Sequence, residues 1–253
     1  MTLEHRISPA VALRPGVAVR SRGSHGAVGS PYDERVLILI DLDNTLIDRD
    51  AAFRGAVAAF LAGHGLPGAD LAWVMEIDAS GYATRDTVAR AITERYRDEV
   101  PPSAVRALLD RGAADRVELP RETEEALLAV REAGGECVIV TNGRVAQQEA
   151  KIRNTGLDRL VQGWVVSEAM GCKKPAPEIF RAAAGLTGRP VDGAWVIGDS
   201  PHADIAGAAA LGLRSVWVSH GRTWSDPAFR PTRVAADVVT AIRDVAGGHG
   251  RVS

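Results

Sequence analysis

The stretch that decides the fold is VLILI at residues 36–40, followed directly by DLDNT at residues 41–45. Five consecutive apolar side chains without polar alternation are typical of a strand that is buried on both faces of a parallel sheet. The carboxylates that follow would lie at the carboxyl end of this strand, where open parallel sheets bind their ligands. The stretch therefore predicts a parallel sheet with an acidic site at its edge.

Further short apolar runs follow downstream, and helical patterns separate them. The runs are residues 137–140, 164–166, 195–197 and 215–218. The helical patterns cover about 120–133, 144–155, 176–186 and 203–211. Strands that alternate with helices predict an α/β fold, a doubly wound (Rossmann-like) parallel sheet.

One long interval breaks this alternation. Residues 51–114 contain helix-start signals and helical periodicity but no convincing buried strand. We therefore expect a small all-helical domain inserted at 51–114, and an α/β core built from 35–50 and 115–247. Residues 1–34 show neither a helical nor a strand period, and we expect a disordered extension there.

Composition narrows the class of protein. With 253 residues, 46% of them hydrophobic, and a net charge of -2, the chain has the balance of a soluble globular protein rather than of a nucleic-acid or membrane binder. Its two cysteines, Cys137 and Cys172, exclude a disulfide framework. No run approaches 18 apolar residues. We expect a cytoplasmic protein, a monomer or a small homo-oligomer, with no nucleic-acid or membrane partner.

Polar clusters follow or flank the other predicted strands as well. They are Thr141-Asn142-Gly143, Lys173-Lys174-Pro175, and Gly198-Asp199-Ser200 with Asp204. The sheet would bring Asp41, Asp43, Asp199 and Asp204 into one crevice. Two like charges about 4 Å apart cost about 4 kcal/mol at an effective dielectric near 20, so such a cluster must bind protons or a cation. Oxygen ligands in a small polar site favour Mg²⁺.

These motifs together resemble the haloacid dehalogenase-like hydrolases, specifically the phosphatases of that superfamily with a helical cap. The resemblance covers about residues 36–245 and rests on four motifs in order. They are Asp41-x-Asp43-Asn44-Thr45, Thr141-Asn142-Gly143, Lys174-Pro175, and Gly198-Asp199-Ser200 with Asp204. The helical interval falls where the first type of cap in that family is inserted.

The resemblance implies a Mg²⁺-dependent phosphomonoester hydrolase that acts on a small phosphorylated metabolite. Asp41 would attack phosphorus and form an aspartyl-phosphate, and Asp43 would protonate the leaving oxygen and then activate water. Thr141 and Lys174 would complete the catalytic set by stabilising phosphoryl oxygens. The remaining assignments are Asn142 and Gly143 as phosphate-binding residues, and Asp41, Asp43 (through its carbonyl), Asp199 and Asp204 as metal-binding residues.

Alternatives remain open at the level of sequence. A phosphosugar mutase shares all four motifs. A 2-haloacid dehalogenase has no need of the carboxylate at Asp43, and a receiver module is about half this length. Asp204 also has an interpretation as a helix cap. The arginines of the helical interval, at 85, 90 and 95, are either a solvated face or contacts to the substrate. The substrate itself is not predicted.

Overall fold

The computed structural model describes residues 11–13 and 35–247. Their centre is a seven-stranded sheet in the order β1-β4-β3-β2-β5-β6-β7. The strands are β1 (Val11–Leu13), β2 (Leu37–Ile40), β3 (Glu136–Thr141), β4 (Gly163–Val166), β5 (Trp195–Gly198), β6 (Arg214–Val218) and β7 (Arg233–Ala235). All neighbouring pairs are parallel except β1 with β4. The order reverses on either side of β2, so β2 and its neighbours flank the crevice in which such sheets bind ligands.

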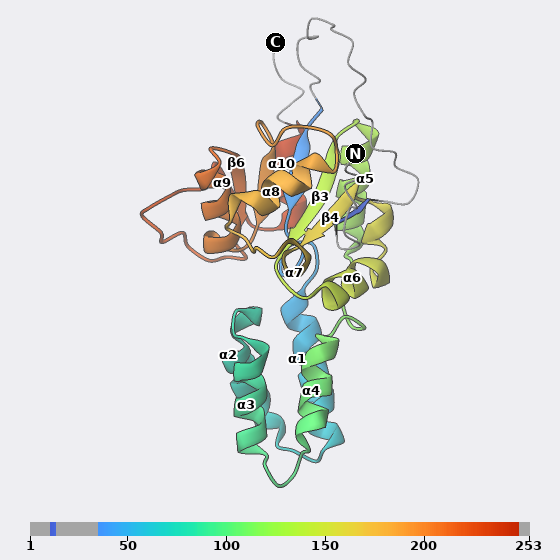
Figure 1. Cartoon of the computed structure of the whole chain (residues 1–253), viewed down its shortest axis with the longest axis vertical. Coiled ribbons are helices and arrows are strands. Elements are labelled where there is room, and N and C mark those ends of the chain that lie inside the picture. Colours follow the sequence, from blue (N-terminus) through green and yellow to red (C-terminus); the bar gives the residue numbers. More distant parts are fainter. Residues whose placement is uncertain (1–10, 14–34, 248–253) are drawn as a thin grey trace, which may run out of the picture.

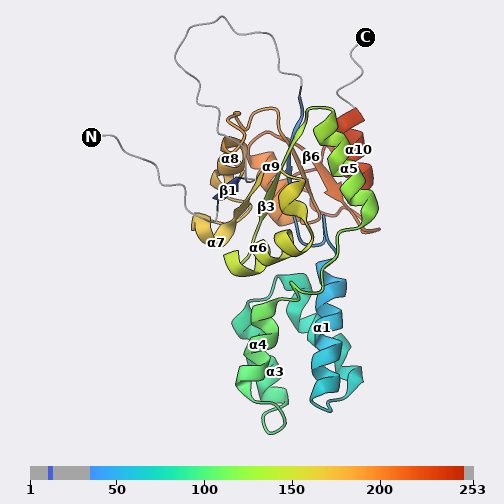
Figure 2. The same ribbon diagram turned by 90° about the vertical axis from the view of Figure 1, so that its right-hand side faces the viewer.

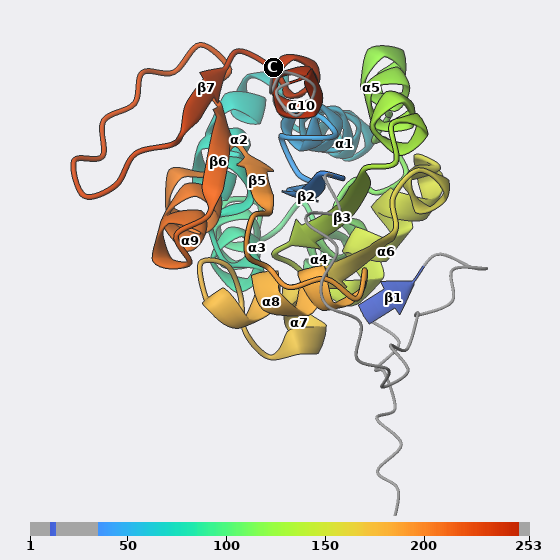
Figure 3. The ribbon, with the colours of Figure 1, turned by 90° about the horizontal axis from the view of Figure 1, so that it is seen from above.

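Helices cover both faces of the sheet, as Figure 3 shows from above. The helices of this core are α5 (Arg121–Glu132), α6 (Val145–Asn154), α7 (Ser167–Met170), α8 (Pro177–Gly185), α9 (Ala206–Ala210) and α10 (Val238–Gly247). Side chains from α5, α6 and α10 share a core cluster with Ile38 and Ile40 of β2. Those from α8 and α9 pack with Leu37 and Leu39 on the opposite face. This alternation explains why all four β2 side chains are apolar.

Between β2 and β3 the chain forms a separate group of helices, seen below the sheet in Figures 1 and 2. Its helices are α1 (Arg49–Gly63), α2 (Leu71–Asp78), α3 (Arg85–Arg95) and α4 (Pro102–Arg111). The Asp48 and Thr84 side chains cap the first turns of α1 and α3. The fold is thus a doubly wound α/β sheet with an inserted helical cap, as the sequence predicts.

The structure departs from the sequence-based expectations in three places. Residues 11–13, inside the expected disordered extension, form strand β1 on β4, whereas the remainder of 1–34 lies outside the described residues. Strand β7 was not predicted, because its burial pattern is largely exposed and lacks an apolar run. The helix expected at 203–211 is a π-helical turn, η4 (Pro201–Ile205), followed by α9. In the described part of the chain, no helix has the length and apolarity needed to cross a membrane.

Candidate active site

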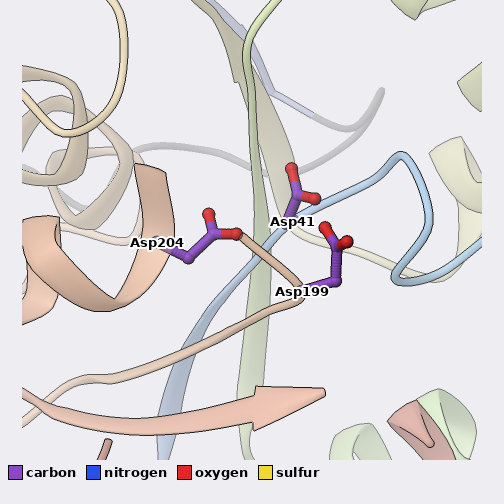
Figure 4. Close-up of side chains that lie close together, drawn as sticks. All are labelled: Asp41, Asp199 and Asp204. Carbon is purple, nitrogen blue, oxygen red and sulfur yellow. The ribbon is translucent and has the colours of Figure 1, made fainter. Parts of the chain in front are cut away.

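Three carboxylates meet at the carboxyl edge of the sheet, as Figure 4 shows. Asp41 follows β2, Asp199 follows β5, and Asp204 lies in η4, with one oxygen of each within 4.8 Å of the others. The Lys174 ammonium lies between two of them, at 2.5 Å from Asp41 Oδ1 and 2.7 Å from Asp204 Oδ1. One buried lysine thus binds two of the three acids and fixes their relative positions.

The backbone around this cluster is shaped to let the carboxylates approach. A Cβ atom on Gly198 would lie 2.2 Å from the Asp204 carboxyl carbon, so only glycine permits this contact. The Thr45 hydroxyl donates to Asp41 Oδ2 at 3.2 Å and accepts from the Asp199 amide at 3.1 Å. The second Asp204 oxygen accepts from the Ser200 amide at 3.0 Å. Both oxygens of Asp204 thus accept hydrogen bonds, as do both oxygens of Asp41. Asp204 differs in its deeper burial, 1% exposed against 8% for Asp41, which suits a supporting position in the cluster.

The second acid of the first motif is held separately from this cluster. Lys151 Nζ lies 2.8 Å from each oxygen of Asp43, and Gln148 Nε2 donates to Asp43 Oδ2 at 3.0 Å. Both partners come from one face of α6, three residues apart, where helical side chains are neighbours. Lys151 is almost fully buried. The structure thus places an ion pair between a buried lysine and a partly exposed aspartate directly beside the carboxylate cluster.

The Thr141-Asn142-Gly143 motif connects these two groups. The Thr141 hydroxyl accepts a hydrogen bond from Gln148 at 2.6 Å. The Asn142 side chain accepts from the Lys174 amide at 2.8 Å and donates to the Lys174 carbonyl at 3.2 Å. This double contact fixes the main chain from which the Lys174 side chain projects. Gly143 has a φ of 149°, and its amide donates to Ser167.

Burial and mutual repulsion perturb the acids of the cluster. Burial raises the pKa of Asp41 to about 7; Lys174 opposes the shift, and the charges of Asp204 and Asp43 add to it. Burial and the charges of Asp41 and Asp204 raise the pKa of Asp199 to about 8. Two such values at one site indicate carboxylates that lack a sufficient counter-charge.

The two lysines differ in their electrostatic setting. Burial opposes the charged form of Lys174, yet Asp204 and Asp41 together raise its pKa. Burial similarly opposes ionisation of Asp43, but Lys151 and the hydrogen bonds from Lys151 and Gln148 hold the pKa of Asp43 below its usual value. Burial dominates at Lys151 and lowers its pKa. In this arrangement Asp43 is a carboxylate, which is the form that accepts a proton.

A cavity of about 320 Å³ lies above these groups, between the sheet edge and the helical cap. Its floor is formed by the motif residues Asp41, Asp43, Thr141, Asn142, Gly143, Lys174 and Asp199. The cap contributes Arg49, Ser80, Gly81, Tyr82, Ala83 and Arg85. Asp204 is buried beneath this floor. The four sequence motifs therefore meet at one cavity, and the cap faces it.

Sequence reasoning missed several residues of this site. Gln148 and Lys151 contact Asp43 from more than a hundred positions away in the chain, and Arg49 and Asp78 form a buried ion pair of the cap. Arg222 also contacts Asp199, at 3.3 Å. One usable signal was present: lysine occurs only at 151, 173 and 174, and two of these three line the site as buried cations. Lys173 is exposed, in agreement with the choice of Lys174.

Comparison with known proteins identifies the class. The family model of the haloacid dehalogenase-like hydrolases matches residues 36–212, and the chain belongs to this family. Glyceraldehyde 3-phosphate phosphatase of Pyrococcus abyssi is 28% identical over 197 residues, 74% of this chain and 82% of that protein. Phosphoserine phosphatase of Thermus thermophilus is 32% identical over 123 residues, which is 49% of each chain.

The solved structures agree on the fold. The hydrolase YfnB of Bacillus subtilis, solved bound to magnesium, superimposes with a TM-score of 0.69 at 22% identity, covering 84% of this chain and 98% of that one. A phosphatase structure from Thermococcus onnurineus gives a TM-score of 0.60 at 18% identity, covering 85% of this chain and 98% of that one. The α/β core with a helical cap is therefore the fold of this hydrolase family.

Proposed function

We propose that this hydrolase is a Mg²⁺-dependent phosphomonoester hydrolase that works through an aspartyl-phosphate on Asp41. The observation that carries the proposal is the bridge from Lys174 to Asp41 and Asp204, beside Asp199 and under an open cavity. In this proposal Asp41 is the nucleophile, and Lys174 is the fixed cation that would meet an entering phosphoryl group. The phosphatase relatives support the same class of reaction.

The residues of the acidic cluster fit a magnesium ion. When all are ionised, the three carboxylates outnumber the two cations that contact them, Lys174 and Arg222, so a net negative charge remains to attract a metal cation. The available ligands are hard oxygen atoms, which Mg²⁺ prefers. We propose that Asp41 and Asp199 hold the ion, with the Asp43 carbonyl, and that Asp204 acts mainly by fixing Lys174. When bound, Mg²⁺ would offset the negative charge of the phosphoryl group.

The protein groups then divide the reaction between them. Asp41 attacks phosphorus, and the Lys174 ammonium and the Thr141 hydroxyl stabilise the charge on the phosphoryl oxygens. Asn142 supports this step by holding Lys174, while Gly143 leaves room for the Gln148 side chain, whose Cδ would lie 3.0 Å from a Cβ at that position. To act as the acid, Asp43 must first take up a proton from solvent. It would then donate this proton to the leaving oxygen, and the carboxylate so formed would accept one from the water that attacks the aspartyl-phosphate. Its resting contact with Lys151 favours the second of these tasks.

The direct test of this function is phosphate release from p-nitrophenyl phosphate. We expect Mg²⁺-dependent release of inorganic phosphate, abolished by EDTA and restored by Mg²⁺ but poorly by Ca²⁺, whose larger coordination shell does not suit the site. A mutase would instead return the phosphoryl group to a sugar, so its rate of phosphate release would stay low. Full activity after thorough chelation, or halide release from 2-chloropropionate, would contradict the proposal.

The raised pKa values give a pH-dependent effect of the metal on stability. Asp41 and Asp199 bind protons more tightly when folded, so without metal the free energy of unfolding falls as the pH rises from about 4 to about 8, by at most about 1.4 kcal/mol per unit for each group. Mg²⁺ competes with these protons. It should therefore raise the melting temperature more at pH 8 than at pH 5.

Differential scanning fluorimetry with and without saturating Mg²⁺ checks this prediction. The Asp199→Asn variant should lose most of the shift at pH 8. The matched control Asp192→Asn, which changes an exposed aspartate, should keep it. An equal Mg²⁺ shift at both pH values, or an unaltered shift in Asp199→Asn, would remove the acidic cluster as the metal site.

A further inference from the structure

The cap wall of the cavity carries an arginine whose hydrogen-bonding capacity is mostly unused. Arg85 is the first residue of α3, and its side chain is only 17% exposed. It lines the same cavity as Asp41 and Lys174. Its single hydrogen bond to the described residues runs from Nη1 to Asp78 Oδ1, at 3.0 Å. A guanidinium carries five N–H donors, so most of those on Arg85 have no protein acceptor in the part of the chain that the structure describes.

The one acceptor that Arg85 has is already used by a second arginine. Asp78 is fully buried, and both of its oxygens accept from the guanidinium of Arg49. The Gly81 amide donates to the same carboxylate, and Asp50 binds Arg49 rather than Arg85. Burial and the nearby charge of Arg49 lower the pKa of Arg85. A guanidinium nevertheless stays charged, and a charge in such a place is costly unless an anion accompanies it.

The other two arginines that the sequence raised as substrate contacts differ from Arg85. Arg95 donates to both oxygens of Asp70 and lies 4.5 Å from the centre of the Trp73 ring. Arg90 is exposed on α3. Neither lines the cavity, whereas Arg85 does. Of the three, only Arg85 combines burial, unused donors and a position above the reacting carboxylates.

Other cationic side chains in the cavity wall add to the positive charge of Arg85. Lys173 and Arg144 also line the cavity, and the Arg144 guanidinium forms an ion pair with the exposed Asp110. Lys174 and Thr141 would contact the phosphoryl group at the floor of the cavity. Arg85, on the cap wall, would then lie near the leaving group of the substrate. Because arginine pairs with carboxylate and phosphate through two parallel hydrogen bonds, its free N–H groups suit a second anion.

We propose that Arg85 selects phosphate monoesters whose leaving group bears a second anionic group, either a carboxylate or another phosphate. This inference rests on the proposed phosphatase function and names the substrate class of that same site. Arg85 would contact the second anion and thereby act on specificity, while the four motifs act on the phosphoryl group.

The test uses substrate pairs that differ only in the second anion. Phosphoglycolate is compared with 2-hydroxyethyl phosphate, and 1,3-propanediol bisphosphate with 3-hydroxypropyl phosphate. Wild-type protein should show a higher kcat/KM for the member with the second anion in at least one pair. A preference in the first pair would indicate a carboxylate as that anion, and a preference in the second pair would indicate a phosphate. Inhibition constants against p-nitrophenyl phosphate hydrolysis give the same comparison for any compound that is bound but not turned over.

The variants assign the preference to one residue. Arg85→Gln should lower the anionic-to-neutral ratio of kcat/KM by about 10- to 100-fold, the range expected for charged hydrogen bonds. Arg85→Lys should restore part of that ratio, because it keeps the charge without the planar fork. Arg90→Gln, an exposed change on the same helix, should leave the ratio and the rate unchanged.

The inference and the proposed function can fail separately. A wild-type protein that hydrolyses p-nitrophenyl phosphate with Mg²⁺ but shows no preference within either pair would overturn the inference and leave the phosphatase proposal standing. An Arg85→Gln variant that keeps the wild-type ratio would likewise overturn the inference alone. Absence of phosphatase activity on all five phosphate esters, with no inhibition, would overturn both.

Discussion

Asp41→Asn is expected to stop turnover of every phosphate ester, with kcat lower than that of the wild type by at least about 10⁴-fold. An amide oxygen is a far weaker nucleophile than a carboxylate, and no other described carboxylate lies at the same place on the cavity floor to replace it. The measurement is steady-state hydrolysis of p-nitrophenyl phosphate with saturating Mg²⁺.

The matched control for this variant is Asp192→Asn, which makes the same chemical change on the surface. Asp41 also accepts from Lys174 at 2.5 Å, so circular dichroism must show that the variant is folded. A folded Asp41→Asn protein with more than about one hundredth of the wild-type kcat would contradict nucleophilic catalysis by Asp41, because loss of the attacking group costs far more than that.

The second large effect is expected for Asp43→Asn, which should separate the two steps of the reaction. With p-nitrophenyl phosphate the leaving group needs little protonation, so phosphoryl transfer to Asp41 should continue. Hydrolysis of the aspartyl-phosphate lacks its base and should slow by about 10²–10⁴-fold. Stopped-flow absorbance should therefore show a burst of nitrophenol followed by a slow steady rate. With an alkyl phosphate the first step should slow as well, and the burst should vanish.

The ion pair between Asp43 and the buried Lys151 makes a second variant necessary. Replacing Asp43 alone leaves the buried Lys151 ammonium without its counter-charge. Breaking a fully buried ion pair from one side costs about 3–5 kcal/mol of stability, and the 26% exposure of Asp43 makes this an upper bound. Lys151→Met combined with Asp43→Asn removes both charges together. If the role of Asp43 is chemical, the double variant should keep the burst with p-nitrophenyl phosphate. A double variant with no burst and normal steady turnover would show that Asp43 has neither task.

The fold was predictable because its central strands have a strong local pattern. Each of the expected core strands was confirmed, as was the helical insertion after the first of them. The edges were not predictable in this way. Strand β7 has only one buried residue, and β1 pairs with a strand about 150 residues further along the chain. Strand β7 therefore has too few buried side chains to show an apolar period, and the three residues of β1 are too few to show one.

The candidate site was predictable to the extent that it follows strand ends. Asp41, Thr141 and Asp199 come from neighbouring strands β2, β3 and β5, whose carboxyl ends the sheet topology brings together. Lys151 carries no such signal, because it lies on the helix α6 and its partner Asp43 is 108 positions away. The same holds for Asp78 and Arg85, whose pairing depends on how α2 and α3 of the cap pack. Tertiary packing decides these contacts.

Transfer of a phosphoryl group to Asp41 underlies every step of the proposed reaction, and trapping the intermediate detects it without relying on rates. The Asp43→Asn protein is mixed with Mg²⁺ and p-nitrophenyl phosphate and quenched in hydroxylamine during the burst, which converts an acyl phosphate into a hydroxamate. Mass spectrometry of the peptide spanning residues 36–49 then locates the modified residue. We expect a hydroxamate on Asp41 whose amount matches the burst. A burst without any modified Asp41, or a hydroxamate at Asp199 instead, would contradict phosphoryl transfer to Asp41.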